Sequence, residues 1–185
     1  PSDMEQAIEM GLDAVKFFPA VPSGGLSMIK ALAAPYHTMR FMPTGGVTPQ
    51  NLTEFLDYPK ILACGGTWMV KPELLATGNF EEITRLTRQT VRTMLDLKID
   101  ELTLPFPHTG NNLSDALHGL INLSSGSTKE LTISCRYLKR TIYHLEKNGA
   151  TFRYDNAKYD SAGNMDAIDF SDAPEEFSIR LIEKH

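Results

Sequence analysis

Three short apolar runs, each followed by a glycine-containing loop and a segment of helical character, constrain the fold of this chain most strongly. The first, Ala14–Ala20, is apolar except for Lys16 and contains a proline near its end; the others are Met39–Pro43 and Ile61–Cys64. They recur at intervals of about two dozen residues. Strands that alternate with helices are typical of a parallel sheet. We therefore expect an α/β fold with three successive β/α units.

A pair of glycines follows the second run, and another follows the third. The two loops read Thr44-Gly45-Gly46 and Gly65-Gly66-Thr67. Glycines at the carboxyl ends of parallel strands leave backbone N–H groups accessible, and the N-terminus of a following helix adds positive potential. The two loops together predict binding of a phosphate or carboxylate, although a single Gly-Gly pair commonly marks only a turn.

Lys16 is the only charged residue in the first run. An ammonium group that is transferred into apolar surroundings tends to lose its proton. A neutral amine can then attack a ketone and form a Schiff base. The alternative is a lysine at the end of a strand whose tip reaches solvent. This segment alone leaves both interpretations open.

The three motifs, in this order, resemble a family of class I bacterial aldolases. The motifs are VKFFPA at Val15–Ala20, FMPTGGV at Phe41–Val47 and CGGTW at Cys64–Trp68. The family cleaves 2-keto-3-deoxy-6-phosphogluconate or 4-hydroxy-2-oxoglutarate to pyruvate and an aldehyde. The resemblance, over about residues 1–97, implies a (β/α)8 TIM barrel, usually trimeric, with its site at the carboxyl ends of the strands. It implies no metal or cofactor, because the protonated imine acts as the electron sink.

The same resemblance assigns roles to individual residues. Lys16 would form the Schiff base with a small keto-acid substrate. Phe18 and Pro19 would form the wall beside the imine, and Thr44 would line the substrate pocket. The loops would bind the substrate phosphate through Gly45, Gly46, Gly66 and Thr67.

The resemblance extends only over a leading helix and the last three β/α units of such a barrel, and a whole barrel needs roughly 200 residues. In the family, a glutamate on an early strand serves as general acid/base, and the resemblance places no residue of this sequence in that role. We therefore expect a partial barrel that is completed by copies of itself or by an N-terminal barrel segment, since its strand faces and edges would otherwise be exposed. A non-catalytic partial barrel that serves in assembly is the alternative.

The second half of the sequence predicts a different architecture. A helix from Asn79 to Leu97 should end the barrel portion at residues 1–97, and proline, glycine and serine make residues 98–129 read as an irregular linker. Residues 130–185 predict the element order βαβββ, which resembles the half-module of the vicinal-oxygen-chelate fold of glyoxalase-like proteins. We expect a small α+β module there.

Metal-binding members of that fold carry a His or Glu on the first strand and a carboxylate on the last. Here the first strand offers Ser134 and Cys135, and the last strand offers only Glu183. We therefore interpret the module as a non-catalytic accessory or assembly unit without a metal site. In the first half, we interpret Trp68 as a core-packing residue.

Composition narrows the classes of partner. The 185 residues are 42% hydrophobic, enough to bury the core of one or two domains. No apolar run approaches the roughly 20 residues that span a bilayer. A net charge of −5 with scattered lysines and arginines argues against nucleic acid or anionic membrane as a partner. Two cysteines far apart in sequence favour a reducing, cytoplasmic location.

Overall fold

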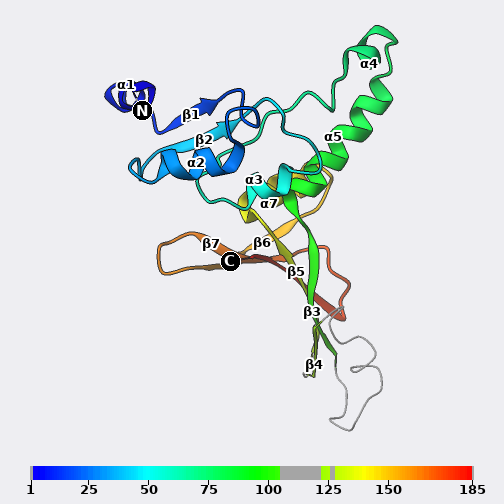
Figure 1. The fold of residues 1–185 in the computed structure, drawn as a ribbon. Helices are drawn as coiled ribbons and strands as arrows, with labels where there is room; N and C mark the ends of the chain where they lie inside the picture. Colours follow the sequence, from blue (N-terminus) through cyan, green and yellow to red (C-terminus); the bar gives the residue numbers. More distant parts are fainter. Residues whose placement is uncertain (1, 105–121, 126–127, 185) are drawn as a thin grey trace. The chain divides into compact units, whose positions relative to one another are not determined.

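The computed structural model describes residues 2–104, 122–125 and 128–184. The chain divides into two compact units, Pro1–Met94 and Leu95–His185, which are described separately below (Figure 1). Within the described residues, no helix is long and apolar enough to cross a membrane.

The first unit alternates helices with short strands. Its elements are α1 (Ser2–Glu9), β1 (Ala14–Phe17), α2 (Gly25–Ala33), β2 (Arg40–Pro43), α3 (Leu52–Leu56), α4 (Pro72–Ala76) and α5 (Phe80–Leu95). Strands β1 and β2 pair in parallel. The third apolar run adds parallel bridges to β2 at Phe41–Ile61 and Thr44–Gly65. The predicted α/β content and the parallel pairing of the three runs are therefore confirmed.

Strand alternation separates a core face from a second face in this small sheet. Phe41 and Pro43 are fully buried. Because successive side chains in a strand point to opposite faces, Met42 lies on the other face. Lys16 is aligned with Met42 in the parallel register and shares that face. The lysine therefore lies opposite the face that packs into the core.

The second unit is built on one six-stranded sheet. Its elements are β3 (Lys98–Leu104), β4 (Asn122–Ser125), β5 (Lys129–Cys135), α7 (Leu138–Glu146), β6 (Phe152–Tyr159), β7 (Met165–Phe170) and β8 (Phe177–Glu183). The strand order is β4-β3-β5-β8-β7-β6. The pairs β3–β4 and β5–β8 are parallel, and the other pairs are antiparallel.

Elements β5, α7, β6, β7 and β8 follow the predicted order βαβββ, which is confirmed. The apolar stripe of α7 explains why this helix packs on the sheet. It contributes Leu138 and Ile142 to a core cluster that also contains Cys135, Phe152, Ile168 and Leu181.

The expectation of an irregular linker over residues 98–129 is wrong where the structure describes that range. Residues 98–104 form β3, and residues 122–125 form β4. Cross-strand pairing explains the difference, because β3 places Leu102 opposite Leu131 of β5, and such pairs stabilise a sheet. Most of the proline and glycine signals of the expected linker fall on residues 105–121, outside the described residues. The first unit ends at Met94 rather than at residue 97.

The core of the second unit yields a direct stability test. Leu181→Ala should lower the free energy of unfolding by about 2–5 kcal/mol, because the removed side chain is fully buried in the core cluster. Ile99→Ala is the matched control, since Ile99 is 55% exposed, and it should change the free energy by no more than about 0.5 kcal/mol. Urea denaturation followed by circular dichroism measures both. Equal losses in the two variants would contradict the assigned core.

Candidate functional site

Lys16 lies on β1, and its side chain is exposed. Its Nζ atom lies 5.0 Å from the centroid of the Phe18 ring, which is itself 66% exposed. Of the two interpretations that the segment left open, the structure shows the lysine at the end of a strand whose side chain reaches solvent. The physical reason is that β1 and β2 bury the face that carries Phe41 and Pro43, whereas Lys16 occupies the other face.

Backbone hydrogen bonds hold the loop after β1 against the loop after β2. The Thr44 N–H donates to the Phe17 carbonyl at 2.9 Å, and the Ala20 N–H donates to the Thr44 carbonyl at 2.7 Å. A third bond joins the Val21 N–H to the Gly45 carbonyl at 3.0 Å. These bonds bring the predicted wall residues and the first glycine loop together at the carboxyl ends of the strands.

The first glycine pair has no room for side chains. Gly45 and Gly46 have φ values of 87° and 83°, a region that L-residues with side chains rarely adopt. A Cβ atom on Gly45 would lie 3.1 Å from the Pro19 Cα, and one on Gly46 would lie 2.6 Å from the Val21 Cβ. The loop therefore packs directly on the segment that follows Lys16.

The second glycine pair lies beside the first loop. The Gly65 N–H donates to the Pro43 carbonyl at 2.9 Å. A Cβ atom on Gly65 would lie 2.4 Å from the Thr44 Cγ2, and one on Gly66 would lie 1.6 Å from the Trp68 ring atom Cζ3. Thr44 thus lies between the loop that carries the predicted phosphate-binding residues Gly45 and Gly46 and the loop that carries Gly66 and Thr67. Thr67 is exposed.

Thr44 carries a buried hydroxyl with no hydrogen-bond partner among the described residues. A buried polar atom that lacks a partner costs free energy, so native structures rarely leave one without a reason. Thr44 also lies two positions after Met42, on the strand face that carries Lys16. Thr44 therefore combines a place on the Lys16 face with a buried hydroxyl that lacks a partner among the described residues.

Asn51 is a part of the site that the sequence analysis missed. Its Oδ1 accepts the Thr48 N–H at 2.8 Å, and its Nδ2 donates to the Gly46 carbonyl at 3.1 Å. Helix α3 begins at Leu52, with Asn51 as its N-cap. An asparagine three residues after a threonine was the available signal, since such side chains commonly satisfy turn N–H groups.

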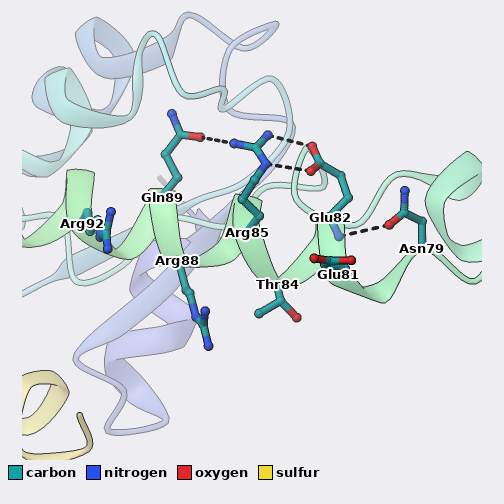
Figure 2. A pocket seen from close by; sticks show the side chains of 8 residues that line it. All are labelled: Asn79, Glu81, Glu82, Thr84, Arg85, Arg88, Gln89 and Arg92. Atoms are coloured by element: carbon teal, nitrogen blue, oxygen red, sulfur yellow. Dashed lines mark hydrogen bonds and ion pairs between the residues drawn. The ribbon is translucent and has the colours of Figure 1, made fainter. Parts of the chain in front are cut away.

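A groove along α5 lies apart from these residues. Figure 2 shows the side chains that line it: Asn79, Glu81, Glu82, Thr84, Arg85, Arg88, Gln89 and Arg92. Arg85 makes two 2.7 Å bonds to the Glu82 carboxylate, which lower the pKa of Glu82 and raise that of Arg85. Exposed pairs of this kind contribute little to stability. The groove contains none of the predicted site residues.

Cys64 precedes the second glycine pair and is a free thiol. Burial raises the pKa of this thiol to about 11. Since the thiolate is the reactive form, the thiol should stay largely protonated and unreactive at neutral pH.

The loop geometry predicts a specific effect of Gly66→Ala. The added methyl group would overlap the indole of Trp68, which must move, so the emission of this single tryptophan should shift to the red. Gly11→Ala is the control, because Gly11 has a φ of 75° and open space around it. That variant should lose stability without a change in emission. An unchanged spectrum for Gly66→Ala would contradict the close packing of loop and ring.

The raised pKa of Cys64 predicts slow alkylation. At about pH 8 the modification rate should be about 100-fold below that of N-acetylcysteine, and it should rise with pH until about 11. Iodoacetamide labelling followed by peptide mass spectrometry measures the rate at Cys64 alone. A rate within about threefold of the free thiol would show that the thiol is not buried.

Comparison with known proteins agrees with the three motifs. Residues 1–86 match the family model described as KDPG and KHG aldolase. Over 91 residues the chain is 47% identical to a 2-dehydro-3-deoxy-phosphogluconate aldolase of Treponema pallidum and 50% identical to one of Haemophilus influenzae. Each alignment covers 49% of this chain and 43% of the relative.

A crystal structure of KDPG aldolase from Legionella pneumophila is 34% identical, with a TM-score of 0.45 over 50% of this chain and 42% of that chain. The chain therefore spans less than half the length of the relatives it matches. The aldolase resemblance read from the three motifs is confirmed over the matched residues. The first unit of this chain is similar to the KDPG and KHG aldolases over residues 1–86.

Proposed function

We propose that the first unit supplies the Schiff-base lysine and the substrate loops of a class I aldolase. The substrate would be of the 2-keto-3-deoxy-6-phosphogluconate or 4-hydroxy-2-oxoglutarate type, and the products would be pyruvate and an aldehyde. One observation carries the proposal. Lys16 and Thr44 occupy one strand face at the carboxyl ends of paired parallel strands, beside two glycine loops, within the residues that match the aldolase family.

The chemistry follows from a primary amine in this position. Nζ of Lys16 attacks the C2 carbonyl of the substrate, and loss of water gives an iminium ion. The electron pair of the C3–C4 bond then moves toward the iminium, which leaves an enamine of pyruvate and releases the aldehyde as the C4 hydroxyl loses its proton. Protonation and hydrolysis of the enamine-derived imine release pyruvate and regenerate the amine.

Each neighbouring group has a part in this proposal. Phe18 and Pro19 form the wall beside the imine, and the Thr44 hydroxyl donates to the bound keto acid. The backbone N–H groups of Gly45, Gly46, Gly66 and Thr67 hold the distal phosphate or carboxylate. The base that accepts the C4 hydroxyl proton would come from the segment that completes the barrel, as the family resemblance implies.

We also propose that a second polypeptide surface covers the open strand face. A partial barrel would be completed by further copies, a trimer by analogy, or by an N-terminal barrel segment. Two apolar side chains that precede β1 are exposed in this chain, Met10 at 75% and Leu12 at 52%. Exposed apolar side chains beside the strand that carries Lys16 support the proposal that another polypeptide covers this surface. Covering would exclude water from the strand face that carries Lys16 and Thr44.

For the second unit we propose a glyoxalase-like accessory module without catalytic function. The order β5-β8-β7-β6 built from a βαβββ segment supports this interpretation. The Glu183 carboxylate accepts the Leu138 N–H at 2.8 Å and so serves the N-terminus of α7. Cys135 is buried in the core, and burial raises its pKa. The free thiols of Cys64 and Cys135 support a cytoplasmic location.

A second candidate function is a non-catalytic partial barrel that acts in assembly. The solvent exposure of Lys16 favours it, because the described residues form no enclosed pocket around the amine that would exclude water from a bound keto acid.

Trapping of the imine distinguishes the two functions. Incubation with pyruvate and borohydride should give a reduced adduct on Lys16, at a yield at least about tenfold above any other lysine, because the site should favour imine formation there. Peptide mass spectrometry locates the adduct. Lys16→Ala should abolish it, whereas Lys71→Ala, which removes another exposed lysine, should leave it unchanged. An even distribution over all lysines would exclude the aldolase role for this chain and favour assembly.

A further inference from the structure

Trp68 is the only tryptophan of the chain, and it lies directly against the second glycine loop. A Cβ atom built on Gly66 would fall 1.6 Å from Cζ3, 2.1 Å from Cε3 and 2.7 Å from Cη2 of the indole. The six-membered ring therefore occupies the space that any other residue at position 66 would need. This contact is more specific than the core packing expected for Trp68 from the sequence.

The indole is fixed from the other side by α5. Its Nε1–H donates to the Oγ1 of Thr90 at 3.2 Å, and the Thr90 hydroxyl in turn donates to the Leu86 carbonyl at 2.9 Å. The hydroxyl proton is thus directed to the helix backbone, which leaves an oxygen lone pair for the indole N–H. The orientation of the ring is therefore determined by a residue that is distant in sequence.

The loop is confined on both sides. Thr44 lies against Gly65, where an added Cβ would approach its Cγ2 to 2.4 Å, and Trp68 lies against Gly66. If the indole of Trp68 could rotate freely, nothing would hold the Gly66 side of the loop in one position. The backbone N–H groups of the loop can hold an anion tightly only if their directions are fixed before it binds.

We propose that Trp68 and Thr90 are positioning residues that set the backbone of Gly66 and Thr67 for a phosphate group on the substrate. This role rests on the proposed function, in which that loop holds the phosphate. Neither side chain contacts the reacting atoms in the proposal, because both act through the loop backbone. Helix α5, which lies outside the three motifs, thereby becomes part of the substrate site.

Helix α5 also carries a threonine that serves as a matched control for Thr90. Thr87 donates its hydroxyl to the Ile83 carbonyl at 2.8 Å, as Thr90 does to Leu86, but its side chain is exposed and makes no bond to Trp68. Thr87→Val and Thr90→Val therefore remove the same bond within the helix and differ in the bond to the indole. Thr90→Ser keeps the hydroxyl and should behave like the unaltered chain.

The first measurement concerns the 185-residue chain without ligand. Thr90→Val should shift the emission of Trp68 to the red and increase its quenching by acrylamide, whereas Thr87→Val and Thr90→Ser should leave both unchanged. An unchanged spectrum for Thr90→Val would overturn the tether, whatever the function of the protein. This readout does not depend on catalytic activity.

The second measurement is calorimetric titration with inorganic phosphate. Thr90→Val and Trp68→Phe should each weaken binding about 5-fold, the equivalent of one lost hydrogen bond, and the double variant should be no weaker than either single variant. If Thr90→Val binds phosphate as tightly as Thr87→Val and the unaltered chain do, the positioning role is wrong and the proposed phosphate loop stands. No phosphate binding by the unaltered chain would instead overturn the proposed phosphate loop, and this role with it.

Discussion

The geometry of the first unit depends on the absence of two Cβ atoms. Gly65 and Gly66 allow the second glycine loop to lie between Thr44 and Trp68. A residue with a side chain at either position would overlap one of these two neighbours. That approach lets the Gly65 N–H reach the Pro43 carbonyl, which joins the third run to β2. Side chains at these positions would push the loop outward and break the bridge at Thr44–Gly65. Parallel pairing and the close packing of the two glycine loops thus share one steric condition.

Local patterns made much of this architecture predictable. The runs at residues 14–20, 39–43 and 61–64 were recognisable because hydrophobicity and glycine placement are properties of neighbouring residues. Strand β3 was not predicted, because its stability comes from pairing with β5 and not from its own composition. The same argument applies to the turn before α3, where Asn51 bonds to Thr48 and to Gly46.

In the candidate site too, features set by neighbouring residues were predictable from the sequence, and features set by tertiary contacts were not. The glycine loops and Lys16 were identified from motifs, and the structure brings their backbones together. The sequence left the surroundings of Lys16 open between burial and solvent exposure, because burial of a strand face depends on what packs over it. The bond from Trp68 to Thr90 links residues in a loop and a later helix, and no pattern in either segment indicates it.

The central pair of strands in the second unit has a consequence for how the protein is made. Strands β5 and β8, the first and last of the βαβββ segment, lie side by side in parallel, so that Lys129 pairs with Phe177 and Cys135 with Glu183. On the ribosome, β5, α7 and the β6–β7 hairpin emerge before the strand that joins them. Contacts between distant parts of a chain form slowly. This unit can complete its sheet only when β8 has been synthesised, so a nascent chain that stalls before β8 would expose the apolar face of β5 to chaperones and proteases.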